Sequence, residues 1–242
     1  MRLRYGDPMS TQTPSTSPVI LAIDVGGTHV KFRTSAADEE RRFDSGATLT
    51  AAQMCAQVAS QTADWTYDRV SVGYPGPVLH GRPVHEPQNL AAGWVGFDFA
   101  TPLARPVKLI NDAAMQALGS YNGGKMLFLG LGTGLGSALI VDGIVEPMEL
   151  AHLPYRKRTY EDYVGLRGLE RLGKKKWRKH VEQVVGLLSA ALEPDEVVLG
   201  GGNAKLITAP PDHVRLGDNA NAFIGGFRLW DDDMNARAHT VK

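Results

Sequence analysis

The stretch that decides the fold, Asp24-Val25-Gly26-Gly27-Thr28, is a glycine turn between two strand-like segments, 19–23 and 29–34. β-Branched and apolar residues follow the turn, which favours a hairpin over the loop-to-helix junction of dinucleotide folds and P-loops. Glycine permits positive φ and the close approach of a ligand, so that successive N–H groups can turn onto phosphate oxygens. The stretch therefore predicts a phosphate-binding hairpin with a carboxylate at its entrance.

A second glycine turn, Gly130-Leu131-Gly132-Thr133-Gly134-Leu135-Gly136, also lies between strand-like segments, 126–129 and 137–141. A single Gly-Thr turn usually does no more than reverse the chain. Two such turns, with the pair Asn111-Asp112 between them, favour a clamp for phosphate groups.

The composition is that of an ordinary globular protein of 242 residues, long enough for one large domain or two smaller lobes. A formal net charge of zero gives no argument for nucleic acid or an anionic membrane surface. No apolar stretch approaches the roughly 20 residues that span a bilayer. The single cysteine, Cys55, excludes an internal disulfide framework and a cysteine-rich zinc site. We expect a cytoplasmic protein that binds neither nucleic acid nor a membrane.

The chain is expected to form two related α/β lobes behind a polar leader. Residues 1–17 are rich in Ser, Thr and Pro, lack the apolar centre of a signal peptide and predict disorder, with Met9 as an alternative start. The lobes are expected over 18–112, completed by a C-terminal helix over 219–232, and over 113–218. No convincing internal sequence repeat relates them. The patterns predict strands at 19–23, 29–34, 41–45, 70–72, 107–110, 126–129, 137–141 and 196–199, and helices at 51–63, 113–118, 174–192 and 219–230.

Two aspartates at strand ends are candidates for phosphoryl-transfer chemistry, which needs phosphate grips, a metal handle and a base. Asp24 can hold Mg²⁺ directly or through water, although it can also simply cap its turn. Asp112 follows the strand at 107–110 and is placed to accept a proton from a sugar hydroxyl. Its structural alternative is to cap the next helix, a role that Asn111 can take instead.

A polar cluster follows the second turn in the string Glu149-Leu150-Ala151-His152, with Glu161 further along the chain. Carboxylates and an imidazole can bind several hydroxyls of one pyranose, and Asn89 can both donate to and accept from a sugar. The alternative is that these are solvated surface residues, which is the usual role of a lone Glu or His in a loop.

Six motifs in order resemble those of the ROK family (repressors, open reading frames and kinases), above all its bacterial polyphosphate/ATP glucokinase branch. The first and second phosphate motifs resemble the two glycine turns, and the catalytic aspartate motif resembles Asn111-Asp112-Ala113-Ala114. The other three are Gly73-Tyr74-Pro75-Gly76-Pro77-Val78, Glu149-Leu150-Ala151-His152-Leu153 with Glu161, and Val198-Leu199-Gly200-Gly201-Gly202.

The resemblance implies a two-lobed, actin-like (ribonuclease H-like) α/β fold with a sugar cleft between the lobes. It implies Asp112 as the base and places on the sugar Asn89, Asn111, Glu149, His152 and Glu161. On the phosphate and donor side we assign Asp24, Gly26, Gly27, Thr28, Lys31, Gly132, Thr133, Gly134, Gly201 and Gly202. The family's cysteine cluster for zinc is missing, so His152 is not expected to bind zinc, and Ala151 replaces a glycine. No DNA-binding helix-turn-helix precedes the first strand, which argues against a repressor.

The acceptor and the donor remain separate questions. We expect phosphoryl transfer to the 6-hydroxyl of glucose with Mg²⁺, from polyphosphate and/or ATP, by a homodimer. Mannose or an N-acetylhexosamine as the acceptor, another actin-like phosphotransferase and a non-catalytic sugar-binding relative are the alternatives. Two dense basic runs, 156–158 and 174–179, are either solvated faces or a track for a polyanion such as polyphosphate.

Overall fold

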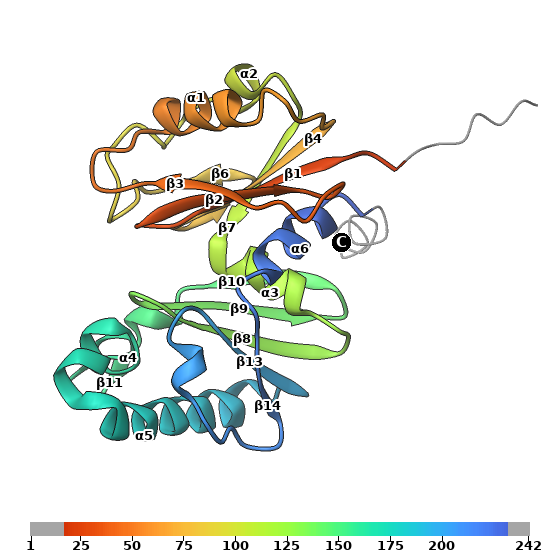
Figure 1. Cartoon of the computed structure of the whole chain (residues 1–242). Coiled ribbons are helices and arrows are strands. Elements are labelled where there is room, and N and C mark those ends of the chain that lie inside the picture. The colour runs from red at the N-terminus through yellow and green to blue at the C-terminus, as the bar shows by residue number, and fades with distance from the viewer. Residues whose placement is uncertain (1–16, 232–242) are drawn as a thin grey trace, which may run out of the picture.

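The computed structural model describes residues 17–231, which form two five-stranded sheets with helices outside and between them (Figure 1). The expected leader lies outside the described residues, apart from Ser17. The first sheet contains β1 (Ile20–Val25), β2 (His29–Thr34), β3 (Arg41–Asp44), β4 (Arg69–Tyr74) and β7 (Val107–Asn111). The second sheet contains β8 (Lys125–Leu131), β9 (Leu135–Val141), β10 (Ile144–Met148), β13 (Glu196–Gly200) and β14 (Val214–Leu216).

The helices and short pieces connect these strands. The helices are α1 (Ala51–Gln61), α2 (Ala100–Leu103), α3 (Asp112–Ser120), α4 (Tyr160–Val164), α5 (Leu166–Leu192) and α6 (Asn221–Arg228). The short pieces are β5 (Val78–Leu79), β6 (Arg82–Pro83), η1 (Leu150–His152), β11 (Pro154–Tyr155), β12 (Arg158–Thr159) and η2 (Ala204–Leu206).

The two sheets share one topology, with the strand orders β3-β2-β1-β4-β7 and β10-β9-β8-β13-β14. In each, the first three strands pair antiparallel, and the last two join on parallel to the first. Each glycine turn joins the first two strands of its sheet, so the two turns occupy equivalent positions. The repeat that the sequence does not show is therefore present in the topology.

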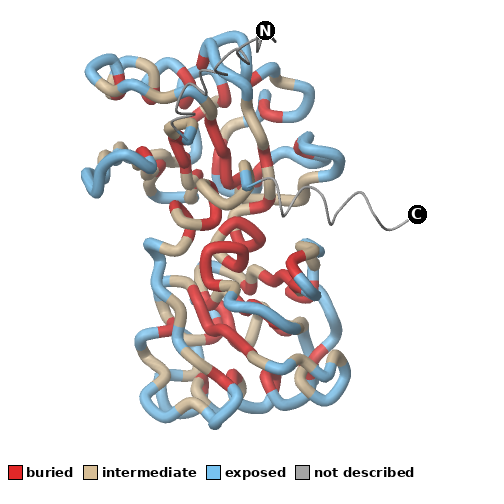
Figure 2. The backbone as a smooth tube through the Cα atoms, turned by 90° about the vertical axis from the view of Figure 1, so that its right-hand side faces the viewer, coloured by how far each residue is buried: buried red, intermediate tan, exposed pale blue. Residues whose placement is uncertain are grey.

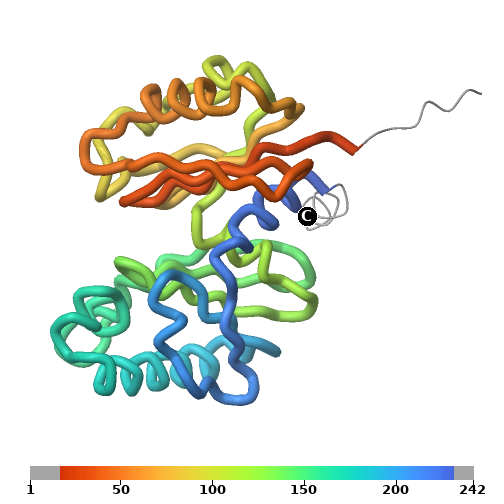
Figure 3. Tube along the Cα trace, viewed as in Figure 1, coloured from red at the N-terminus to blue at the C-terminus, as the bar shows by residue number. Residues whose placement is uncertain are grey.

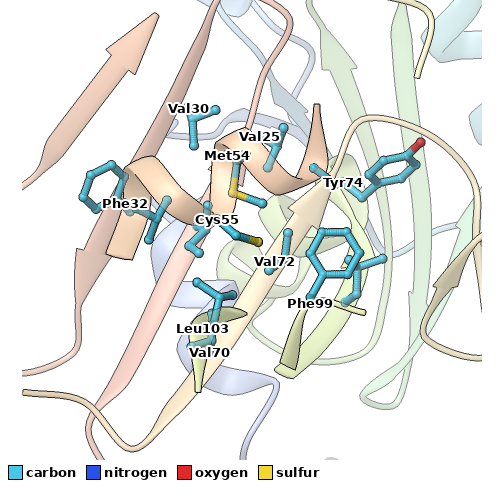
Figure 4. Close-up of a cluster of buried hydrophobic side chains, with 14 of the residues drawn as sticks. Val25, Val30, Phe32, Met54, Cys55, Val70, Val72, Tyr74, Phe99 and Leu103 are labelled. Atoms are coloured by element: carbon cyan, nitrogen blue, oxygen red, sulfur yellow. The ribbon is translucent and has the colours of Figure 1, made fainter. Parts of the chain in front are cut away.

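Each sheet packs its outer face against one long helix. Helix α1 starts with a capping box between Thr50 and Gln53 and buries Met54 and Cys55 against the first sheet, as Figure 4 shows beside Val72. Helix α5 does the same for the second sheet through residues at helical spacing: Trp177, Val181, Val184, Val185 and Leu188.

Helices α3 and α6 lie between the sheets and cross each other closely, although they are far apart in the chain (Figure 3). A Cβ on Gly119 would lie 1.8 Å from the Asn221 carbonyl oxygen, and one on Gly225 would lie 1.8 Å from the Met115 carbonyl oxygen. Only glycine allows two backbones to approach in this way. Figure 2 shows the buried backbone in the strands of both sheets and in the helical turns between them.

α6 also covers the inner face of the first sheet. The Ser71 hydroxyl on β4 donates to the Gly226 carbonyl at 2.5 Å, and the Arg33 guanidinium on β2 lies over Phe223 and Phe227. We propose that the chain divides into two lobes near Asn111 and that α6 belongs to the first lobe.

All predicted strands and helices are present, with ends shifted by a few residues. The sequence analysis did not predict β10, β14, α2, α4 or the short pieces, and it began α5 too late. α5 starts at Leu166 and is interrupted at Gly173, where φ is +71° and ψ is 157°. The expected start at Lys174 therefore corresponds to the second stretch of a kinked helix.

Candidate active site

A cleft of about 720 Å³ opens where the two glycine turns face the start of α3 and the residues that follow β10. All but two of the predicted site residues line it. These are Asp24, Gly26, Gly27, Lys31, Asn89, Asn111, Asp112, Gly132, Thr133, Gly134, Glu149, His152, Glu161 and Gly201. Thr28 and Gly202 are not among the lining residues, so the structure does not bring these two to the cleft.

Asp112 is the first residue of α3, and Asn111 caps that helix. The Asn111 side chain accepts from the Ala114 N–H at 3.0 Å and donates to the Gly76 carbonyl at 3.1 Å. The Asp112 carboxylate accepts only a local bond, from the Ala113 N–H at 2.8 Å, and lines the cleft. The capping role that competed with a chemical role for Asp112 thus belongs to Asn111.

The environment of Asp112 favours its protonated form near neutral pH. Its pKa is raised to about 7, first by burial and then by the charge of Asp24, with a smaller rise from Glu149. The Ala113 hydrogen bond opposes these effects. A carboxyl group with such a pKa can exchange a proton with a substrate at physiological pH.

Asp24 pairs in the β1–β2 ladder with Lys31, which places the two side chains on the face of the sheet that borders the cleft. Burial raises the pKa of Asp24 to about 6, against the opposing charge of Lys31. Among the described residues that line the cleft, Lys31 is the sole lysine or arginine.

The donor set fits a hard cation that keeps part of its water shell. Asp24 and Asp112 are carboxylates with raised pKa values, and a divalent cation beside them would favour their charged forms. Within residues 17–231, no group of three or more His, Cys, Asp or Glu side chains is arranged to hold a metal. Asp24 is thus one carboxylate that could hold Mg²⁺ together with water.

Two glycines of the turns, Gly27 and Gly134, allow close approach of another segment, and the turn glycines do not need positive φ, contrary to part of the sequence analysis. None of Gly26, Gly27, Gly132 and Gly134 has a positive φ. A Cβ on Gly27 would lie 3.2 Å from Asn89 Cβ, and one on Gly134 would lie 2.7 Å from Glu161 Oε2. The turns thus allow sugar-side residues to pack directly against them.

The second turn is fixed by its carbonyl groups. The Leu166 N–H at the start of α5 lies 3.1 Å from the carbonyl oxygens of both Gly132 and Thr133. The Asn203 side chain donates to the Gly132 carbonyl at 3.2 Å. Beside Gly132, the position of a Cβ is open to at least 4 Å, which leaves room for a ligand.

His152 lies between two carboxylates that also line the cleft. Its Nε2 is 3.9 Å from Glu149 Oε2, and its Nδ1 is 3.8 Å from Glu161 Oε1. Burial raises the pKa of Glu149, while His152 opposes the rise and Glu161 adds to it. The Ser137 hydroxyl anchors the approach to Glu149, because it donates to the Met148 carbonyl at 2.7 Å and accepts from the Leu150 N–H at 3.3 Å.

The cleft also contains polar residues that the sequence analysis did not assign. They are His85, Glu86, Gln88, Gln116 and Asn219. Gln116 lies one helical turn after Asp112 and donates to Asn219 at 3.0 Å, so helical spacing from Asp112 was a usable signal for it. Glu86 fixes the loop that holds Asn89, because its carboxylate accepts from the N–H groups of Gly93, Trp94 and Val95 at 3.0, 3.0 and 3.3 Å.

Neither basic run lines the cleft. Arg156 instead donates to Gln183 at 2.9 Å, and Arg178 donates to the Leu206 carbonyl at 2.5 Å. The side chains of Lys174, Lys175 and Lys176 are exposed on α5 just after its kink. Over residues 17–231, no helix combines the length and the apolar character that crossing a bilayer requires.

Part of this chain is similar in sequence to known sugar kinases. The polyphosphate glucokinase of Mycobacterium tuberculosis (strain ATCC 25618 / H37Rv) is 30% identical over 148 residues, which are 55% of this chain and 56% of that protein. The kanosamine kinase of Amycolatopsis mediterranei (strain S699) is 33% identical over 149 residues, 54% of this chain and 48% of that protein. The chain thus spans about half the length of the curated relatives it matches.

A solved structure matches over nearly the whole chain. The inorganic polyphosphate/ATP-glucomannokinase from Arthrobacter sp. strain KM superposes with a TM-score of 0.76 at 24% identity, covering 91% of this chain and 100% of that one. This similarity confirms the predicted two-lobed, actin-like α/β fold. The ROK family model matches residues 20–146. Because this match covers more than half of the chain, the chain belongs to the ROK family.

Proposed function

We propose that this protein is a sugar kinase that transfers a phosphoryl group from polyphosphate and/or ATP to the 6-hydroxyl of glucose. The observation that carries the proposal is the position of Asp112, a carboxylate of raised pKa that faces the same cleft as both glycine turns and the Glu149–His152–Glu161 cluster. The similarity to a polyphosphate glucokinase and to an inorganic polyphosphate/ATP-glucomannokinase supports glucose as the acceptor and polyphosphate or ATP as the donor.

The residues divide the work. Glu149, His152, Glu161 and Asn89 hold the sugar through its hydroxyl groups, and Asp112 takes the proton of the attacking hydroxyl as the new oxygen–phosphorus bond forms. The bond between that phosphorus and the bridging oxygen of the donor breaks, and ADP or a polyphosphate shortened by one unit leaves. The two turns orient the donor phosphates, whose charge Lys31 helps to balance. Mg²⁺, held by Asp24 directly or through water, supplies charge neutralisation on the phosphates when it is bound.

A panel of sugars with two donors tests the proposal. We expect glucose 6-phosphate to form with ATP or polyphosphate, and EDTA to abolish its formation. The panel also includes mannose, N-acetylhexosamines and kanosamine. Kanosamine is included because the chain is 33% identical over 149 residues to a kanosamine kinase. If a folded sample phosphorylates no hexose with either donor, the proposal is wrong.

The pH dependence of kcat/KM is expected to show an acid limb governed by Asp112. A base acts only when it is deprotonated, and the pKa of Asp112 is raised to about 7, so activity falls as the pH drops below this range. A cation beside Asp24 favours the charged carboxylate, so a limb somewhat below 7 is expected with saturating Mg²⁺. Initial rates at low glucose between pH 5 and 9 measure it, and a profile flat down to pH 5 would contradict the assignment.

The donor preference is expected to depend on the basic run on α5. A long polyanion bound in the cleft must continue along the surface, and Lys174, Lys175 and Lys176 are exposed cations that could continue its path. Replacing all three with Gln is expected to raise the KM for long polyphosphate several-fold and to leave the KM for ATP and glucose unchanged.

The matched control replaces the same three lysines with arginine, which keeps the charge. It is expected to retain polyphosphate affinity, and in the unmodified protein that affinity should fall steeply with salt. Equal KM values for polyphosphate in the Gln and Arg variants would show that this run is only a solvated face.

A further inference from the structure

The segment 149–165 carries the three polar cleft residues Glu149, His152 and Glu161 but contains little regular structure of its own. It consists of η1, the two-residue strands β11 and β12, and the five-residue helix α4. Elements this short are not stable in isolation. The positions of Glu149, His152 and Glu161 therefore depend on what holds the segment against the rest of the lobe.

A buried tyrosine in the middle of the segment makes side-chain hydrogen bonds to α5, in addition to the bonds that Trp177 and Arg171 donate to the carbonyls of Val164 and Asp162. Tyr155 is 7% exposed, and its hydroxyl donates to Gln183 Oε1 at 2.8 Å and lies 3.0 Å from His180 Nδ1. Because a tyrosine hydroxyl has one proton, His180 must donate from Nδ1 to the Tyr155 oxygen. The result is a directed Tyr155–His180–Gln183 chain in which each group has a defined role.

The surroundings reinforce this chain. The Tyr155 ring packs on the rings of Tyr160 and Tyr163, with centroid–centroid distances of 5.3 and 5.1 Å. The ring centroids of Tyr163 and His180 are 4.8 Å apart. Burial lowers the pKa of His180, and the charges of Arg156 and Arg171 lower it further, which favours the neutral imidazole. The hydrogen bonds of Tyr155 assign the single ring proton to Nδ1.

Tyr155 lies between the cleft residues His152 and Glu161 along the chain and in space. Tyr155 follows His152 by three residues, and its ring contacts Tyr160, the neighbour of Glu161. The Tyr160 N–H donates to the Leu153 carbonyl at 3.1 Å, which ties the two ends of the β11–β12 turn together. A shift of Tyr155 would therefore move His152 and Glu161 together.

We propose that Tyr155, held by His180 and Gln183, is a positioning residue that sets hexose affinity by holding the 149–165 segment in place. This inference rests on the proposed function for its link to the sugar. The Tyr155 hydroxyl touches no reacting atom, so its loss should weaken sugar binding while the chemical step survives.

The test compares Tyr155→Phe with Tyr163→Phe. Both remove one hydroxyl from the same aromatic cluster, but among the described residues the Tyr163 hydroxyl makes no hydrogen bond. We expect Tyr155→Phe to raise the KM for hexose about 5- to 10-fold, as the loss of one or two part-buried hydrogen bonds implies, with kcat within about twofold. Tyr163→Phe should leave both constants within about twofold.

A second pair of variants tests the direction of the chain. His180→Asn keeps an N–H donor near the position of Nδ1 and is expected to retain most of the affinity for hexose, whereas His180→Ala should behave like Tyr155→Phe. Equal effects of the two His180 substitutions would overturn the role given to the imidazole.

Hydrogen exchange separates this inference from the proposed function, because it needs no turnover. Amides in 150–164 should exchange faster in Tyr155→Phe than in Tyr163→Phe, while those in β8 and β9 stay unchanged. Equal exchange, or a fall of kcat at constant KM, overturns the positioning role. If the unmodified protein phosphorylates no hexose, the proposed function fails, and the exchange comparison still decides whether Tyr155 holds the segment.

Discussion

Replacing Asp112 with asparagine is expected to lower kcat at least about 100-fold while the KM for hexose changes little. The amide keeps the shape of the side chain but cannot accept the proton of the attacking hydroxyl. Asn111 continues to cap α3, so the helix has no reason to unravel. Steady-state rates with saturating donor and varied glucose measure the effect.

The free energy of unfolding of the same variant should not fall with kcat but stay equal or rise. Burial and the charge of Asp24 raise the pKa of Asp112 to about 7, so above that pH the folded protein contains an unfavourable buried charge that asparagine removes. We expect the variant at pH 8 to resist urea at least as well as the unmodified protein. Asp212→Asn, on an exposed loop, is the control and should change neither property. A near-normal kcat in Asp112→Asn would reduce Asp112 to a structural residue.

Gly225→Ala is expected to destabilise the protein by about 1–3 kcal/mol or more, since a new Cβ would collide with a backbone carbonyl. That Cβ would lie 1.8 Å from the Met115 oxygen on α3, and backbone atoms cannot swing aside as the end of a side chain can. The two helices would have to separate, and with them the sheets that they join. The free energy of unfolding in urea measures the loss.

Gly186→Ala is the matched control. Gly186 is also inside a helix, but it is exposed, and a Cβ there would meet no atom within 4 Å. Alanine should stabilise this position by about 0.5–1 kcal/mol, because it restricts the unfolded chain and favours helix. If the two substitutions cost the same, the close crossing of α3 and α6 does not contribute to stability.

The sequence predicted what local patterns can encode. The alternation around Asp24 and Gly132 identified both hairpins, and the residues Asn111-Asp112 marked the strand-to-helix junction where the structure places them. Glu149, His152 and Glu161 were grouped as a polar cluster after the second turn, and the structure brings the two carboxylates within 4 Å of His152. Their roles remain proposals.

What the sequence could not show depends on contacts between distant segments. Gly119 and Gly225 are unremarkable helix positions until α3 and α6 cross, and nothing near either residue in the chain signals the other. The same holds for His85, which enters the cleft because the Tyr74 hydroxyl holds its carbonyl at 2.7 Å. The expectation that the turn glycines need positive φ was wrong, because none of them adopts it, although both turns do line the cleft.

The position of α6 has a consequence for how the chain acquires its structure. The inner face of β1 and β4 is covered by residues 221–228, so this face of the first sheet stays uncovered until nearly all of the described chain has been synthesised. A ribosome-bound chain that ends before Asn221 would expose Ala22 and Ser71 to solvent. Contacts of such long sequence separation slow folding. We therefore expect the N-terminal half to mature late, only after residues 221–228 have been synthesised, and to be the part most prone to aggregation until then.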